Sequence, residues 1–168
     1  MLDTTTFFSP WYWALAMSVW VAIGAGTYGV PHGLMRRAAR MGADDAAMAD
    51  RIARDFAARA AAFWPRWGLA SIAGTSFVLT ALMVLALVAG SEAALGLLMI
   101  AGPAAALAGL SMHEALLVHT HQPRAEVLLE VMISRRRMNL SVGGGALALT
   151  ALIAVLMHQD RLMFFAPI

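Results

Sequence analysis

Apolar residues fall into four long runs, separated by two arginine-rich segments and one short turn. The runs cover residues 11–35, 67–89, 94–118 and 138–158. A helix needs about 20 apolar residues to cross a bilayer, and each run has about that length. The pattern therefore predicts an all-α integral membrane four-helix bundle, formed by a single membrane domain over residues 1–168.

The first run carries a helix-packing signal and a possible irregularity. Ala25, Gly29 and Gly33 recur at every fourth position, a spacing that lets two helix backbones approach closely in a membrane. Pro31 follows Gly29, and proline removes a backbone donor from a helix. We expect one helix over 11–35 with a small-residue stripe and a loosened last turn.

The segment 36–66 mixes basic, acidic and apolar residues. Met48, Ile52, Phe56, Ala60 and Phe63 fall on one face at helical spacing. This predicts an amphipathic helix over 44–63 at the membrane surface. The alternative is a helical arm that simply continues the second span out of the membrane.

The segment 119–137 ends in three consecutive arginines. We expect a short amphipathic helix over 124–134, which Arg135, Arg136 and Arg137 end at the interface. The arginine run is interpreted first as a topology anchor. A site for anionic lipid is the second interpretation.

The composition supports a membrane protein and excludes several kinds of chemistry. Hydrophobic residues make up 61% of the chain and charged residues 13%. There is no cysteine, which excludes thiol catalysis, disulfides and thiolate metal sites. All twelve basic residues are arginine, as expected of a GC-rich bacterial genome. The first ten residues lack a basic start, so we expect no cleaved signal peptide.

The distribution of arginine predicts the topology. Eleven of the twelve arginines lie in segments 36–66 and 119–137. The positive-inside rule places both segments in the cytoplasm and both termini in the periplasm of a bacterial inner membrane. The basic residues are thereby explained by topology, and no nucleic-acid partner is expected.

This topology suggests one candidate site in the cytoplasmic half. His32 and His113 lie near the cytoplasmic ends of the first and third spans, at similar depth for a rise of about 1.5 Å per residue. Two imidazoles from different helices can hold heme b or a divalent metal. Tyr28 lies one turn from His32, and Glu114 follows His113. The alternatives are a proton site, or interfacial histidines that bond only to backbone or headgroups.

Other candidates are weaker. His119 and His121, at the end of the third run, could join His113 in a metal site, but such residues are more often a solvated helix end. Twelve methionines invite a copper site; because they are scattered, core packing explains them better. Ser71, Asn139 and Ser141 fall near the level of the histidines, and His158 is assigned no role.

Several residues of the first hairpin resemble a known family. These are Trp20-Val21-Ala22, then Tyr28, Pro31 and His32, followed by an arginine-rich segment and a basic cluster before Asn139. This layout resembles small bacterial four-helix membrane proteins that include the membrane protoporphyrinogen oxidases and the copper-resistance D type proteins. The resemblance implies heme b or porphyrin handling, with His32 as a candidate axial ligand.

Two functions are compatible with these patterns. The first is a heme-binding membrane protein for redox or porphyrin chemistry. The second is a non-catalytic accessory or assembly subunit of a larger respiratory or photosynthetic-type membrane complex, partnered by other subunits or by copies of itself. The histidine pair favours the first, and the small-residue stripes favour the second.

Overall fold

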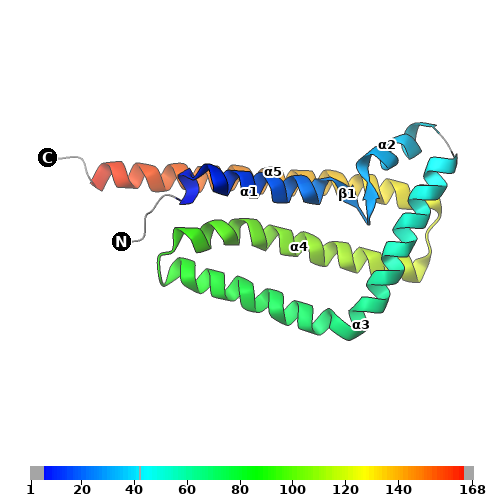
Figure 1. Cartoon of the computed structure of the whole chain (residues 1–168), viewed down its shortest axis with the longest axis horizontal. Coiled ribbons are helices and arrows are strands. Elements are labelled where there is room, and N and C mark those ends of the chain that lie inside the picture. Colours follow the sequence, from blue (N-terminus) through cyan, green and yellow to red (C-terminus); the bar gives the residue numbers. More distant parts are fainter. Residues whose placement is uncertain (1–5, 42, 165–168) are drawn as a thin grey trace.

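The computed structural model of the chain describes residues 6–41 and 43–164. Helices make up nearly all of this part, which confirms the all-α prediction. The elements are a 3-10 turn η1 (Thr6–Phe8), α1 (Pro10–Gly24), strands β1 (Gly26–Thr27) and β2 (Val30–Pro31), α2 (His32–Met41), α3 (Ala43–Leu87), α4 (Glu92–His121) and α5 (Ala125–Phe164). In Figure 1, α1, α4 and α5 run alongside one another, and the far half of α3 follows α4.

Within the part of the chain that the structure describes, three helices, α3, α4 and α5, are long and apolar enough to cross a membrane. This agrees with the predicted membrane character. Helix α1 has 15 residues, and a rise of about 1.5 Å per residue makes it roughly 22 Å long. That length is shorter than a hydrocarbon core of about 30 Å, so α1 differs from the other three.

The prediction of one helix over 11–35 is wrong, because α1 ends at Gly24. The chain then forms a tight antiparallel hairpin in which Thr27 pairs with Val30. Its two central residues have positive φ, +51° at Tyr28 and +74° at Gly29. Type I′ turns require this backbone at both central positions.

The small-residue stripe of the first run is likewise not a helix interface. Gly29 lies in the turn, and a Cβ on Gly33 would find no atom within 4 Å. The break has a physical cause: Pro31 cannot donate a helical hydrogen bond and disfavours helix in the residue before it. The glycines at 24, 26 and 29 lower helix propensity further.

Helix α3 continues without interruption from the arginine-rich segment into the second apolar run. The segments predicted as 44–63 and 67–89 are therefore one helix, as the alternative of a continuing arm required. The position of the first half relative to the membrane stays a prediction. Pro65 lies inside the helix. Figure 1 shows a sharp bend between the two halves of α3, as expected where proline removes a hydrogen bond.

The buried face of the first half of α3 consists of alanines. Ala49, Ala53, Ala57 and Ala60 are at most 5% exposed. Of the larger residues predicted for this face, Ile52 and Phe56 pack at its edge, whereas Met48 and Phe63 are exposed. The buried face is therefore shifted by one residue along the sequence from the predicted face. Its small side chains let the neighbouring elements approach closely.

The third run is confirmed as the middle of α4, which continues through Pro103. The segments predicted as 124–134 and 138–158 are one helix, α5. The expectation that Arg135, Arg136 and Arg137 end a helix is wrong. Arginine has high helix propensity, and no glycine or proline separates the two segments.

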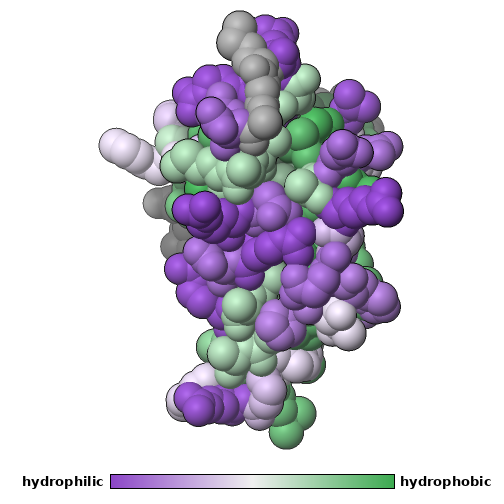
Figure 2. Space-filling view, turned by 90° about the vertical axis from the view of Figure 1, so that its right-hand side faces the viewer, coloured by the Kyte–Doolittle hydropathy of each residue, from purple (hydrophilic) through white to green (hydrophobic). Residues whose placement is uncertain are grey.

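Buried side chains gather at two ends of the molecule. One cluster joins the hairpin, α2, the first half of α3, the end of α4 and the start of α5; Tyr28, Met35, Leu128 and Met132 belong to it. The second lies at the opposite end, where Phe7, Tyr12, Ala16, Ile100 and Ala154 pack together. Figure 2 views the end that holds the first cluster, and hydrophilic side chains cover much of it.

Arg54 fixes the first half of α3 across the α4–α5 connection. Its guanidinium donates to Asp50 Oδ2 at 2.7 Å on its own helix. It also donates to Gln122 Oε1 at 2.6 Å and to the Pro123 carbonyl at 2.7 Å. These bonds join the first half of α3 to the α4–α5 connection at the polar end of the molecule.

Candidate functional site

A buried arginine lies at the centre of the polar interior. The side chain of Arg135 is 2% exposed, although it belongs to the run predicted to anchor the chain at the membrane surface. Arginine remains protonated in proteins and is rarely buried without partners. Its contacts therefore define the site.

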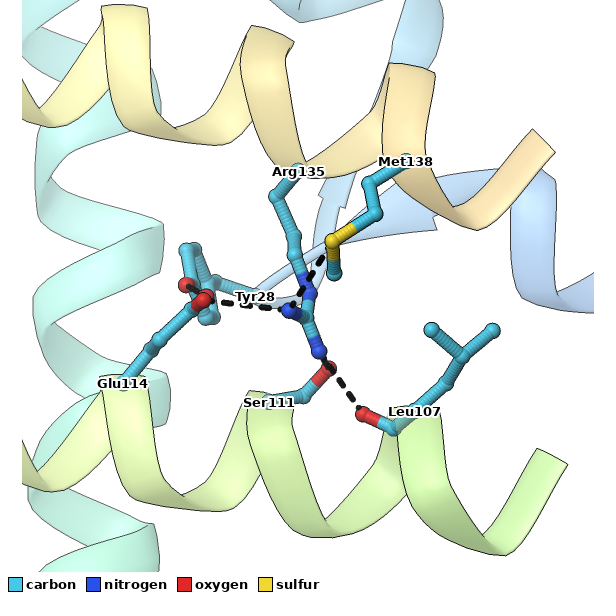
Figure 3. A network of polar contacts seen from close by, with 6 residues as sticks. All are labelled: Tyr28, Leu107, Ser111, Glu114, Arg135 and Met138. Carbon is cyan, nitrogen blue, oxygen red and sulfur yellow. Dashed lines mark hydrogen bonds and ion pairs between the residues drawn. The ribbon is translucent and has the colours of Figure 1, made fainter. Parts of the chain in front are cut away.

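The guanidinium of Arg135 reaches from α5 to α4, as Figure 3 shows. Nη1 donates to Glu114 Oε1 at 3.0 Å, which forms a salt bridge. Nη2 donates to the Leu107 carbonyl at 3.0 Å and to Ser111 Oγ at 3.3 Å. Leu107, Ser111 and Glu114 follow one another at helical spacing, so one face of α4 accepts hydrogen bonds from both terminal nitrogens of the guanidinium.

The second carboxylate oxygen of Glu114 accepts a hydrogen bond from the Tyr28 hydroxyl. Tyr28 is 6% exposed, and its ring packs against Phe56 with the centroids 6.1 Å apart. It lies in the hairpin turn, outside the three long apolar helices. Burial, followed by the hydrogen bond to Glu114, raises the pKa of the Tyr28 hydroxyl above its ordinary value. The phenol therefore stays protonated and donates.

Tyr28, Glu114 and Arg135 thus form one network that joins the hairpin, α4 and α5. The carboxylate neutralises the guanidinium, and the phenol occupies the other carboxylate oxygen. Asn139 lies one turn after Arg135 and is 6% exposed. Its Oδ1 and the Nε of Arg135 are buried without a hydrogen-bond partner among the described residues.

Part of Glu114 remains accessible. Its side chain is 31% exposed and borders a hollow of about 230 Å³ that His121, Leu117 and Val131 also line. Each oxygen of this carboxylate already accepts a hydrogen bond, one from Tyr28 and the other from Arg135. The arrangement favours holding the helices together over turnover chemistry.

The candidate residues are distributed over different surroundings. His32 begins α2 and lines a groove between α2 and α5. His113 is exposed on α4 and is not among the residues that line this groove. Tyr28 and Glu114, which the sequence placed beside the histidines, are instead brought together with Arg135.

The two histidines at the end of α4 are exposed. The backbone carbonyl of His119 accepts from Gln122 Nε2 at 2.8 Å, and His121 Nδ1 lies 3.1 Å from the Leu117 carbonyl. Within residues 6–41 and 43–164, no group of three or more His, Asp or Glu side chains is arranged to hold a metal ion. Ser71 and Ser141 are exposed, and the side chain of His158 lies outside the described part.

Sequence reasoning missed Arg135, yet a signal for it exists. The buried residues of α5 in this region are Leu128, Met132, Arg135 and Asn139. Their spacing of four, three and four residues is that of one helix face. Arg136 and Arg137 fall off this face, so the periodicity separates the structural arginine from its two neighbours.

Comparison of the chain with protein-family models, curated proteins and solved structures returned no match.

Proposed function

We propose that the chain is a non-catalytic accessory subunit of a larger complex in the bacterial inner membrane. In this proposal α3, α4 and α5 cross the bilayer, and α1 with η1 completes a four-helix membrane bundle. The arginine-rich end faces the cytoplasm, as the positive-inside rule favours. Other membrane subunits cover the apolar surface of α3.

The proposal rests on the exposure of the apolar half of α3. The most apolar 18-residue window of α3 is 0% buried within the chain, whereas the corresponding windows of α4 and α5 are each 22% buried. Leu69, Phe77 and Leu87 are at least 75% exposed. A span that its own chain does not cover must be covered by lipid or by another protein.

The chemistry of the groove between α3 and α4 favours a protein. The groove has a volume of about 310 Å³, and its lining includes Ser71, Thr75, Ser76, Ala108 and Gly109. Small and hydroxyl side chains are typical of helix–helix contacts in membranes, because they allow close backbone approach and hydrogen bonds. A partner helix fits this lining better than lipid tails do.

A pair of glycine variants tests this proposal. Added Cβ atoms at Gly109 in α4 and at Gly144 in α5 would both meet no atom within 4 Å. Neither site therefore has an atom that blocks the first side-chain carbon in the isolated fold. On a native gel of membranes solubilised in mild detergent, wild type should migrate in a larger complex. Gly109→Leu should release the chain, and Gly144→Leu should not.

Equal behaviour of the two variants would refute the proposed interface. A chain that migrates alone when extracted from its native membrane would refute the accessory role. Co-purification of two differently tagged copies, with no other protein present, would identify the partner as a second copy and contradict the proposed hetero-complex.

Heme b binding is the second candidate, and one observation favours it. The Nδ1 atom of His32 is buried and has no hydrogen-bond partner among the described residues. Two imidazoles facing one cavity would hold heme iron, but only His32 of the proposed pair lines the α2–α5 groove. His32 is thus the member of the proposed pair whose surroundings support this candidate.

An absorption spectrum distinguishes the two candidates. Protein purified from heme-replete cells should show a Soret band if heme is bound, and His32→Ala and His113→Ala should each shift or abolish it. His158→Ala serves as the control, because the sequence assigns that residue no role. A colourless protein leaves the accessory role as the only candidate.

A further inference from the structure

The groove between α2 and α5 is lined by basic side chains. His32, Arg36 and Arg40 contribute from α2, where they follow one another at intervals of four residues. Arg136 and Arg137 contribute from α5. The groove has a volume of about 260 Å³, which is enough for a phosphate group with part of the molecule that carries it.

The positive charge of this groove is not neutralised within the described chain. The ion pairs among the described residues involve Arg37, Arg54 and Arg135, and none of the four groove arginines. Among the described residues, no aspartate or glutamate lines the groove. Four guanidinium groups in one groove repel one another, so an anion placed among them would relieve that repulsion.

Unused hydrogen-bonding atoms also lie at the groove. The Nε of Arg136 is buried and has no acceptor among the described residues. A guanidinium N–H can only donate, so this atom is a donor that lacks an acceptor. The buried Nδ1 of His32, on the facing helix, also has no partner there. His32 and Arg136, which line the groove from the two helices, thus each contain one buried polar atom without a partner among the described residues.

We propose that this groove binds a phosphate group, carried either by an anionic phospholipid or by a free phosphate anion. Guanidinium groups recognise phosphate by paired, charge-assisted hydrogen bonds. Met35, Ala39 and Ile133 give the groove an apolar part beside the arginines, which suits the glycerol and acyl region of a lipid. The groove borders the polar end shown in Figure 2, where headgroups would lie in the proposed orientation. This inference does not depend on the accessory role.

Binding to wild-type protein forms the first test. Protein in neutral detergent is titrated separately with phosphatidylglycerol, phosphatidylcholine and inorganic phosphate, and bound lipid is counted by native mass spectrometry. Retention of phosphatidylglycerol over phosphatidylcholine identifies a lipid headgroup as the ligand. A thermal shift with inorganic phosphate alone identifies a free anion. If neither ligand binds, the proposal is overturned.

Variants locate the binding. The double variant Arg36→Gln/Arg136→Gln should weaken binding by at least about tenfold, because each lost charged hydrogen bond contributes strongly. Arg51→Gln/Arg59→Gln removes two exposed arginines of α3 outside the groove and should leave affinity within about twofold, allowing for the general charge term. Without ligand, the groove variant should melt no lower than wild type, because it removes repulsion. Equal loss in both double variants would show general charge attraction instead of a site.

Discussion

Arg135 is the residue on which three elements meet. It is buried against α4, paired with Glu114, and linked through that carboxylate to Tyr28 in the hairpin. Burying such a pair gives little net stability, but removing one partner leaves a charge without compensation. The network therefore acts mainly by allowing one arrangement of α4, α5 and the hairpin.

The first prediction concerns this pair. Arg135→Met should lower the free energy of unfolding by about 3 kcal/mol, because Glu114 is left without its cation. The double variant Arg135→Met/Glu114→Gln should recover part of the loss. Thermal or denaturant unfolding in detergent measures both. Arg59→Met, on the exposed face of α3, is the control and should change stability by less than about 0.5 kcal/mol. If the effects of Arg135→Met and of Glu114→Gln alone add up to the effect of the double variant, the pairing is contradicted.

The second prediction concerns the hairpin turn. Gly29→Ala should destabilise the fold by about 1–2 kcal/mol, because its φ of +74° disfavours a side chain. The steric surroundings of a Cβ at Gly29 are ordinary, with Phe56 Cδ2 at 3.7 Å, so the loss should come from the backbone. Gly33→Ala is the matched control: it lies in α2 with open space around it and should be neutral or slightly stabilising. The melting temperatures of the two variants measure this difference, and equal values would contradict a backbone cost at Gly29.

Sequence reasoning at this scale identified some residues of the network and not their arrangement. Glu114 attracted attention because an acid near an apolar run is costly, and Tyr28 because of its spacing from His32. The link between them depends on the turn at Tyr28 and Gly29, which brings the phenol to α4. A positive φ at tyrosine is unusual, so no propensity rule predicts it.

At the scale of elements, α3 has two halves with different surfaces in one helix. Its first half packs through an alanine face, and its second half is apolar enough to cross a membrane. The alanine face lets α2, the end of α4 and the start of α5 approach the helix closely. Larger side chains on this face would separate them.

The third prediction tests this face. Ala57 is 2% exposed, whereas its neighbour Ala58 is exposed. Ala57→Leu should destabilise the fold by about 1–3 kcal/mol through overpacking. Ala58→Leu should have little effect, since both residues favour helix. Circular dichroism during heating measures the difference, and equal melting curves would show that the alanine face is not closely packed.

The elements also show where pattern reasoning lost accuracy. The apolar periodicity gave the interior of α4 well, because its run is long and bounded by a turn and by Pro123. It divided α3 wrongly at the residues around Pro65, which are typical of a membrane interface, and α5 wrongly at its three consecutive arginines. Charged residues end a membrane span but do not end a helix, and α5 continues through three arginines.

For the whole molecule, both ends of the bundle have distinct character. Figure 1 places the start of α1 and the far end of α5 at one end, and α2 with the first half of α3 at the other. The arginine-rich segments lie at the second end. This arrangement is compatible with the topology predicted from charge, in which that end is cytoplasmic.

The fourth prediction tests the orientation. Alkaline phosphatase fused after Ile168 or after Gly90 should be active, because both sites are predicted to be periplasmic. A fusion after Gln122 should be inactive, because the α4–α5 connection is predicted to be cytoplasmic. Reporter activity in intact cells, normalised to the amount of fusion protein, gives the result. The reverse pattern would invert the bundle and move the phosphate groove to the periplasmic surface.

The salt bridge between Glu114 and Arg135 also has a consequence for biogenesis. Glu114 is synthesised 21 residues before Arg135, so α4 leaves the ribosome while its acid still lacks a counterion. A helix that enters the membrane alone must carry that acid unpaired or protonated, at a free-energy cost. Joint insertion of α4 and α5 as a hairpin removes this cost. The pair thus favours an order of assembly in addition to a final structure.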